Sequence, residues 1–183
     1  MSVYHVIDLS KHLNHRLFYD DMSGMKEYGI ENTFIYDYYN DLKCVEVIHN
    51  VSFQFYFGWS NDNIVCDNQE ININHIVNKI HIVGFSYLQS NNTFFEVIYD
   101  DETSEKIKVP FISWIESFSE GYERTSLYGN NIRTFKWYEA SGEEKVVICF
   151  HHIVVELPKI RKVKKIILPD DFLIHIFGMT IEE

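Results

Sequence analysis

The chain has 183 residues, of which 46% are hydrophobic and 23% charged, so it can bury a sizeable core and is not a mostly disordered chain. Its formal net charge of −11 argues against broad binding to nucleic acid or anionic membranes, and no apolar run approaches the ~20 residues of a membrane helix. Asp8 stands where a signal peptide would be apolar, so we expect a cytoplasmic protein, unless the chain is an excised domain of a secreted one.

The composition favours strands over helices. Isoleucine and valine far outnumber leucine, Ala140 is the only alanine, and 16% of the residues are aromatic. Such β-branched and aromatic side chains pack well on pleated sheets. A loop or a single helical turn is expected at residues 20–29. The short strands expected in the N-terminal third are residues 3–9, 44–48, 52–57 and 64–66.

The middle of the chain is more regular. Residues 75–88 form an extended apolar run, and residues 93–100 and 105–112 alternate between apolar and polar side chains. Asn91-Asn92 and the polar residues 100–103 separate the three segments. Tight turns between alternating segments predict a meander of three antiparallel strands.

The C-terminal part completes the predicted architecture. Residues 145–157 are apolar on both faces, which predicts a central strand that Pro158 ends. The other strands expected here are residues 132–138, 163–168 and 172–179. No long amphipathic helix, linker or repeat is visible. The sequence therefore predicts a single domain over residues 1–183, an all-β, two-sheet antiparallel β-sandwich of roughly ten strands.

Four blocks, in order, carry a resemblance to a known family. Residues 163–181 (VKKIILPDDFLIHIFGMTI) are similar to the closing strands V-K-S-I-T-L-P-N-N-x-x-I-H-I-F-A-M-T-L of galactose-binding-domain-like modules. These jelly-roll modules are appended to many bacterial glycoside hydrolases. The earlier blocks that resemble the family are IDLSKHLN at residues 7–14, NIVCDNQEI at residues 63–71 and FISWIES at residues 111–117.

The resemblance implies a jelly-roll sandwich that binds carbohydrate without catalysis, alone or beside a glycoside hydrolase. It also permits a structural calcium ion, for which Asp20, Asp21 and Glu31 are oxygen ligands of the right type. The chain departs from the family where Asn68 replaces the glycine before Gln69, and the loop after Asp20 lacks a glycine-rich stretch.

Two segments have the composition of a sugar site, which needs an aromatic face and planar polar groups. In the first, Trp59 is followed by Asn61 and Asp62; the alternative is a tryptophan packed over the end of a sandwich beside a polar turn. The second spans residues 121–133; the alternative is an ordinary surface connection with internal ion pairs. The candidate ligand-binding residues of the second segment are Tyr122, Arg124, Tyr128, Asn130 and Arg133.

Other patterns are less specific. His151 and His152 with Glu156 suggest a cupin-like metal site, but neighbouring side chains of a strand point to opposite faces and cannot chelate one ion. The basic residues between Lys159 and Lys165 form either a charged edge or a docking patch for an acidic partner or glycan. Three cysteines without CxxC spacing indicate reduced thiols.

The sequence contains no G-x-S-x-G elbow, phosphate-binding loop or H-E-x-x-H motif, so we expect no enzyme and no catalytic residue. The leading hypothesis is a non-catalytic carbohydrate-binding module without a cofactor. The second is a protein-interaction or structural β-sandwich that self-associates, and the third is a cupin-like metal enzyme.

Overall fold

The computed structural model describes most of the chain, in seven segments. These segments are residues 2–19, 32–35, 45–56, 60–87, 91–113, 130–139 and 144–183.

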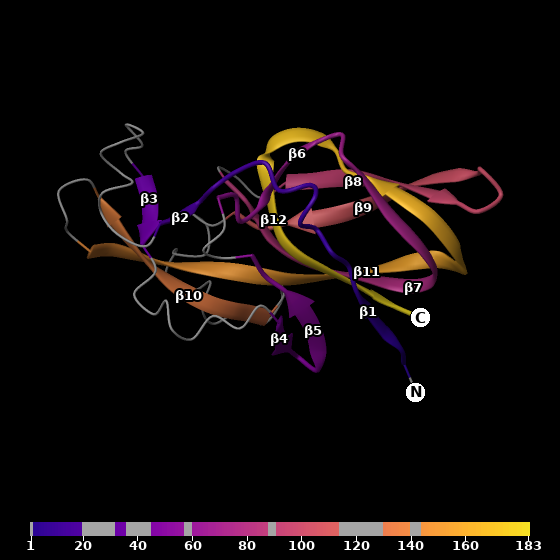
Figure 1. Cartoon of the computed structure of the whole chain (residues 1–183), viewed down its shortest axis with the longest axis horizontal. Coiled ribbons are helices and arrows are strands. Elements are labelled where there is room, and N and C mark those ends of the chain that lie inside the picture. The colour runs from indigo at the N-terminus through magenta and orange to yellow at the C-terminus, as the bar shows by residue number, and fades with distance from the viewer. Residues whose placement is uncertain are drawn as a thin grey trace.

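The described residues form strands and no helix, which confirms the all-β prediction (Figure 1). Every described strand pair is antiparallel except β2–β3, and no described segment is a helix long and apolar enough to span a membrane. The strands are β1 (Tyr4–Val6), β2 (Phe18–Tyr19), β3 (Asn32–Ile35), β4 (Val45–Ile48), β5 (Val51–Gln54), β6 (Ile64–Asp67), β7 (Glu70–Ser86), β8 (Asn91–Tyr99), β9 (Ser104–Phe111), β10 (Asn130–Glu139), β11 (Glu144–Ile167) and β12 (Asp170–Glu182).

Two long strands organise the molecule. β7 and β11 pair antiparallel along most of their length, and Figure 1 shows both of them turning round one end of the molecule. The register of this pair shifts between Glu156 and Arg161, where β11 has extra residues. A bulge of this kind bends a strand, so each long strand contributes one half to each of two layers.

The expectation that Pro158 ends a strand is wrong. β11 continues through Pro158 to Ile167. Proline has no backbone N–H to give to a ladder, but Pro158 lies inside the register shift, where no ladder partner is required of it. The proline therefore marks the bend of the strand and not its end.

The predicted three-stranded meander is also corrected. β8 pairs with β9, as expected, but its other neighbour is the second half of β11, not β7. The second half of β7 lies instead between β11 and β12. Because β7 bends away at the end of the molecule, the strand that follows it along the chain belongs to the other layer.

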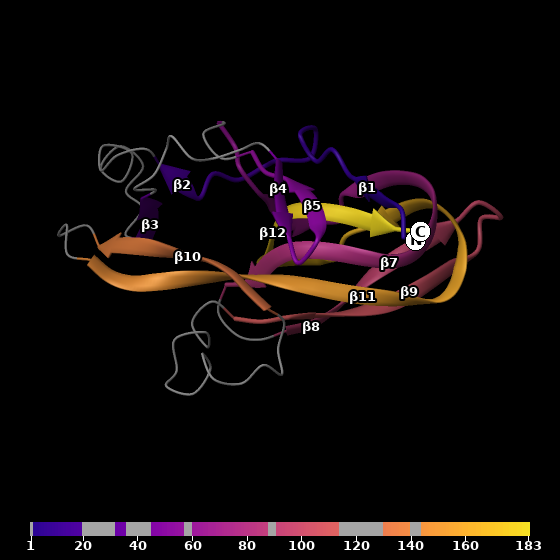
Figure 2. The same cartoon turned by 90° about the horizontal axis from the view of Figure 1, so that it is seen from below.

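Figure 2 shows β8 and β9 on one side of β11, and β12 with the β4–β5 hairpin on the other side. The described layers fit the predicted sandwich. The main core lies between them and contains aliphatic side chains of both halves of β7, among them Ile71, Ile73, Ile80 and Ile82.

The other face of β7 and β12 is covered by the β4–β5 hairpin. Gly178 of β12 lies beneath Phe53 and Gln54 of β5, and Thr180 Oγ1 donates a hydrogen bond to the carbonyl of Ser52. The hairpin turns at His49 and Asn50, whose φ angles of 48° and 66° fit a type I′ turn. This second, smaller core explains why the end of β12 is buried on both faces.

The polar residues of the family-like blocks connect strands. Asn14 donates to the carbonyl of Val65 and accepts from its N–H, at 2.9 and 2.8 Å, so the amide extends β6 as a further strand residue would. The hydroxyl of Tyr56 donates to Asp8 at 2.7 Å and accepts from the N–H of Leu9 at 2.8 Å. The hydrogen bond from Tyr56 holds the pKa of Asp8 below its usual value.

Asn68 has a φ angle of 55°. Glycine and asparagine adopt this left-handed conformation more readily than other residues, so asparagine suits this turn. Gln69 closes the same turn, because its side chain accepts from the N–H of Asp67 and donates to the carbonyl of Val65.

Candidate functional site

Most of the predicted sugar-binding side chains lie outside the part of the chain that the structure describes. This applies to Trp59, Tyr122, Arg124 and Tyr128, and to the candidate calcium ligands Asp20, Asp21 and Glu31. Asn130 and Arg133 lie in β10, whose backbone is described and whose side chains are not. The ligand roles of these residues stay predictions.

Asn61 and Asp62 are described, and Asp62 points inward. Its carboxylate is fully buried, accepts hydrogen bonds from the N–H of Leu17 at 3.0 and 3.2 Å, and accepts one from Asn63 at 2.7 Å. Asn61 is half-buried and donates to the carbonyl of Leu13 at 3.3 Å. In this arrangement both side chains hold the N-terminal segment against the start of β6.

Asn63 links this contact to the interior. Its side-chain oxygen lies 3.0 Å from Nδ1 of His175, and its nitrogen lies 3.2 Å from Nδ1 of His15. Burial, with a smaller contribution from His15, lowers the pKa of His175 to about 3. His175 is therefore neutral at pH 7 and accommodates the buried amide as a hydrogen-bond partner.

The described ends of the two predicted sugar-binding segments are separated by most of a sheet. One row of paired residues runs from Ile64, next to Asn63, through Ile176, Gly84 and His151 to Asn131. Four strand spacings of about 4.8 Å give roughly 19 Å along the sheet. The structure does not bring these two ends together.

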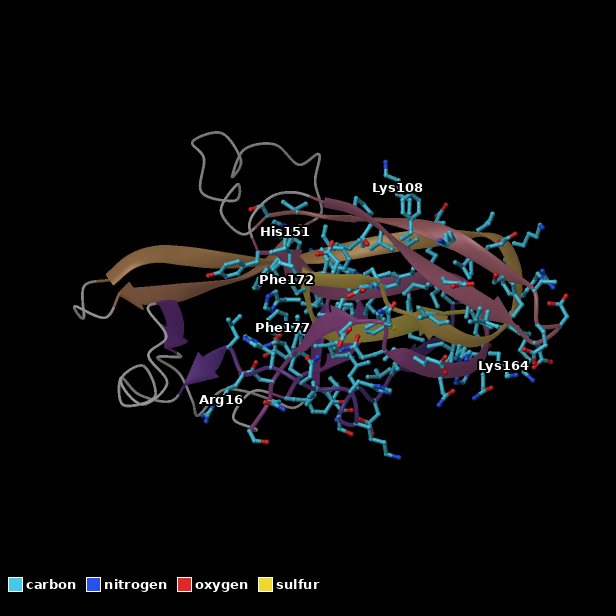
Figure 3. The ribbon with its side chains drawn as sticks, turned by 90° about the horizontal axis from the view of Figure 1, so that it is seen from above. Arg16, Lys108, His151, Lys164, Phe172 and Phe177 are labelled. Atoms are coloured by element: carbon cyan, nitrogen blue, oxygen red, sulfur yellow. The ribbon has the colours of Figure 1, made fainter. Side chains whose placement is uncertain are left out.

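His151 and His152 point to opposite faces, as predicted. His151 is fully buried opposite Gly84, on the face of the main core, and Figure 3 labels it inside the molecule. His152 contacts the rings of Phe53 and His49 on the other face. Burial lowers the pKa of each histidine to about 4. The strand geometry excludes a shared ion between them, and Glu156 is exposed.

The basic residues near the end of β11 are each paired with a carboxylate, and Figure 3 shows Lys164 at the end where the long strands turn. Arg161 pairs with Asp101, and it also lies 4.3 Å from the ring centroid of Tyr99. The other pairs are Lys159–Glu105, Lys162–Asp100, Lys164–Glu102 and Lys165–Glu70. This ladder of ion pairs joins β11 to the β8–β9 turn, to the start of β9 and to β7. The charged-edge interpretation is corrected, because residues 163–167 of β11 pair with β7 on one side and with β8 on the other.

An open groove of about 540 Å³ lies between β9 and the middle of β11, and we call it the β9–β11 groove. Lys106, Ile107, Lys108 and Pro110 line one wall, and residues 154–158 of β11 line the other. Val154 is 46% exposed, although this part of β11 was predicted to be covered on both faces.

Lys106 and Lys108 differ from the paired basic residues. Within the described residues neither lysine has a carboxylate within ion-pair distance, and Figure 3 shows Lys108 extending away from the ribbon. Phe94 of β8 is the cross-strand partner of Lys108 and is 52% exposed. The apolar side chains that line the β9–β11 groove, the exposed ring of Phe94 and the two lysines therefore lie on one side of the molecule.

Sequence reasoning assigned no function to Lys106 and Lys108, although the signal was visible. The alternation in residues 105–112 places both lysines on the same face of a strand. That neither lysine has an ion-pair partner in the described part of the chain could not be foreseen, because it depends on the pairing register of β8, β9 and β11.

The chain matches no family model and no curated protein. The class that the structure itself defines is an all-β protein with antiparallel layers, and the site must be argued from its own residues.

Proposed function

We propose that the protein is a non-catalytic carbohydrate-binding module of jelly-roll type, and that it binds a glycan chain carrying carboxylate or sulfate groups along the β9–β11 groove. The observation that carries the proposal is that Lys106 and Lys108 have no ion-pair partner among the described residues, whereas all five cations of the neighbouring run are paired.

The chemistry of the groove suits an acidic sugar chain. Pro110 and Val154 provide apolar contact for the C–H face of a sugar ring, and two ammonium groups face carboxylates of the ligand. Phe94 adds an exposed ring beside Lys108, on which a further sugar unit stacks. An open groove admits a chain from either end, which fits an interior segment of a polysaccharide better than a single sugar.

Binding should be weak and sensitive to salt. Each exposed ion pair contributes roughly 0.2–1 kcal/mol, and screening reduces it at physiological ionic strength. The net charge of −11 opposes the approach of an acidic polymer, so affinity depends on the two lysines and not on the field of the whole protein.

The test is calorimetry with an oligogalacturonate and with an uncharged galacto-oligosaccharide of equal length. We expect binding of the acidic chain only, at least roughly twofold weaker in the Lys106→Gln/Lys108→Gln variant, as the loss of two exposed pairs implies. Lys159→Gln/Lys162→Gln is the matched control, because it removes the same charge from paired positions. Equal loss in both variants would show that net charge alone attracts the ligand.

The predicted loop segments provide a second test of the same function. If Trp59→Ala and Tyr128→Ala abolish glycan binding while the lysine variant leaves it intact, the module binds sugar at its loops and the groove assignment is wrong. If the wild-type protein binds no glycan on a broad array, carbohydrate binding is refuted altogether.

One observation favours a second candidate function, which is protein interaction by strand addition. Among the described strands, none pairs with the outer edge of β11 at residues 153–158, so that edge offers backbone donors and acceptors to an extended peptide or to a second copy. Light scattering tests self-association. A dimer that Val154→Lys converts to a monomer supports strand addition, and a strict monomer without peptide binding refutes it.

A further inference from the structure

Three metal-ligating side chains converge where the two ends of the described chain meet the bend of β7. His5 comes from β1, His75 from β7, and Glu183 directly follows β12. Oε1 of Glu183 lies 3.0 Å from Nε2 of His5 and 3.3 Å from Nδ1 of His75. One ligand atom from each residue falls within 4.8 Å of the other two.

The fold forces these residues together. β1 pairs with β12 so that His5 lies opposite Ile181, a residue of the main core, and the N–H of Glu183 donates to the carbonyl of Val3. His75 follows Asn74, whose φ angle of 59° kinks β7. The cluster therefore lies at the rim of the sandwich and joins the N-terminal strand, the C-terminal residue and the bent strand.

Hydrogen bonding satisfies only part of this arrangement, because Nδ1 of His75 forms a hydrogen bond with Glu183 and Nε2 of His5 does not. Both histidines approach the same carboxylate oxygen, and their rings stack with centroids 3.9 Å apart. Nε2 of His5 is buried and has no hydrogen-bond partner, although Glu183 is only 3.0 Å away, because the geometry is unsuitable. A buried nitrogen that faces an oxygen without a shared proton is unfavourable unless a cation lies between them.

We propose that His5, His75 and Glu183 bind a divalent transition-metal ion, of which Zn²⁺ is the best match. Two imidazole nitrogens and one carboxylate oxygen are ligands of zinc at about 2.0–2.2 Å, and a tetrahedron of that radius has edges of about 3.4 Å. The two contacts of Glu183 are close to this length. Imidazole ligands favour zinc over calcium and magnesium, which prefer oxygen.

Three protein ligands leave the fourth position of the zinc to water or to an added anion. All three ligands lie on different strands, so the ion also clamps β1 and the end of β12 to β7. Because an unfolded chain cannot keep residues 5, 75 and 183 together, binding stabilises the folded protein in proportion to the free ion concentration.

The test uses the full chain without an affinity tag, dialysed against EDTA. Calorimetry with ZnCl₂ should give one ion per chain, and Co²⁺ should give the visible absorption of a tetrahedral site. His75→Gln and Glu183→Gln should each weaken Zn²⁺ binding by at least about tenfold, since even outer-sphere partners of a metal contribute this much. Zinc should raise the midpoint of thermal unfolding of the wild type and not of the two variants.

Two neighbouring substitutions provide matched controls. His12→Gln removes a histidine of the N-terminal segment and Glu182→Gln a glutamate next to Glu183, and both should keep the wild-type zinc affinity. Far-UV circular dichroism of each variant without metal checks that it folds. The proposal is overturned if no Zn²⁺ binds below millimolar concentration, or if binding survives in His75→Gln and Glu183→Gln and is lost in His49→Asn, which would assign the ion to another histidine cluster.

Discussion

Glu182, at the end of β12, contacts one histidine directly, and Glu183, which follows the strand, contacts two; the two sets are built differently. Glu182 lies on the face covered by β4–β5, where Oε2 contacts Nε2 of His81 at 3.0 Å, and Nδ1 of His81 contacts Nε2 of His152, also at 3.0 Å. Nδ1 of His152 then lies 3.2 Å from Nδ1 of His49. The groups form a line, whereas those around Glu183 converge on one point.

The difference separates a structural network from a ligand site. In the line, Glu182 also accepts from the hydroxyl of Ser2 at 2.8 Å and lies 3.6 Å from Lys79, so its charge is matched. Burial raises the pKa of Glu182, but the hydrogen bonds from Ser2 and His81 outweigh it and hold the pKa below its usual value. In a network of this kind the ligand atoms are already used in hydrogen bonds and do not converge on an ion. The ligand atoms of His5, His75 and Glu183, which we call the convergent set, do converge.

Acidification should show the largest effect, because the buried histidines are neutral in the folded protein. Burial lowers the pKa of His151 and His152 to about 4 and that of His175 to about 3, so the unfolded chain binds protons first as pH falls below 6.5. Stability therefore rises with pH between these values and is lost on going from pH 7 to 5, by about 1–2 kcal/mol for each histidine.

Urea unfolding at pH 7, 6 and 5 in the presence of EDTA measures this loss. His152→Gln should make the pH dependence shallower, because it removes one of the histidines whose pKa burial lowers. A free energy of unfolding that stays constant between pH 7 and 5 would contradict the neutral, buried state of these histidines.

The second largest effect separates the two glutamates directly. Glu182→Ala removes hydrogen bonds from Ser2 and His81 to a buried carboxylate, and we expect a loss of about 2–3 kcal/mol in the free energy of unfolding. Glu183→Ala, measured without metal, should cost less than about 0.5 kcal/mol, because its side chain is one-third exposed. Denaturation at pH 7 with EDTA makes the comparison, and equal losses would remove the distinction between the sets.

The sequence predicted the strands better than their pairing. Period-two alternation located β8 and β9 and their turn, because a strand with one buried face carries that pattern locally. The bend of β11 at Pro158 was missed, since a proline inside a bulge has the same sequence as a proline after a strand. Once the bend is missed, β8 is assigned the wrong neighbour.

The candidate sites show the same limit. His5, His75 and Glu183 have no motif spacing, because three distant strands bring them together and only the register of β1 with β12 reveals it. The pairing of Lys159–Lys165 with the β8–β9 turn is equally non-local. Asp62 looked like a surface ligand in a polar loop, and the structure uses its carboxylate to cap the N–H of Leu17.

The smallest expected effect concerns which ring nitrogen carries the proton in each histidine of the line from Glu182 through His81 and His152 to His49. Because the Glu182 carboxylate only accepts, His81 carries its proton on Nε2 and leaves Nδ1 as an acceptor for Nε2–H of His152. Nδ1 of His152 then accepts from Nδ1–H of His49. Long-range ¹⁵N–¹H spectra at pH 7.5 should find the proton on Nε2 in the first two histidines and on Nδ1 in the third.

His49→Asn should cost less than about 0.5 kcal/mol, since asparagine tolerates the φ angle of 48° at this position and only the exposed end of the line is lost. The tautomers of His81 and His152 should not change, because Glu182 fixes them from the buried end. If the substitution moved the proton of His152 to Nδ1, the exposed His49 and not the buried Glu182 would determine which nitrogen of each histidine carries the proton. The contrast between a hydrogen-bond network fixed from within and an ion site would then fail.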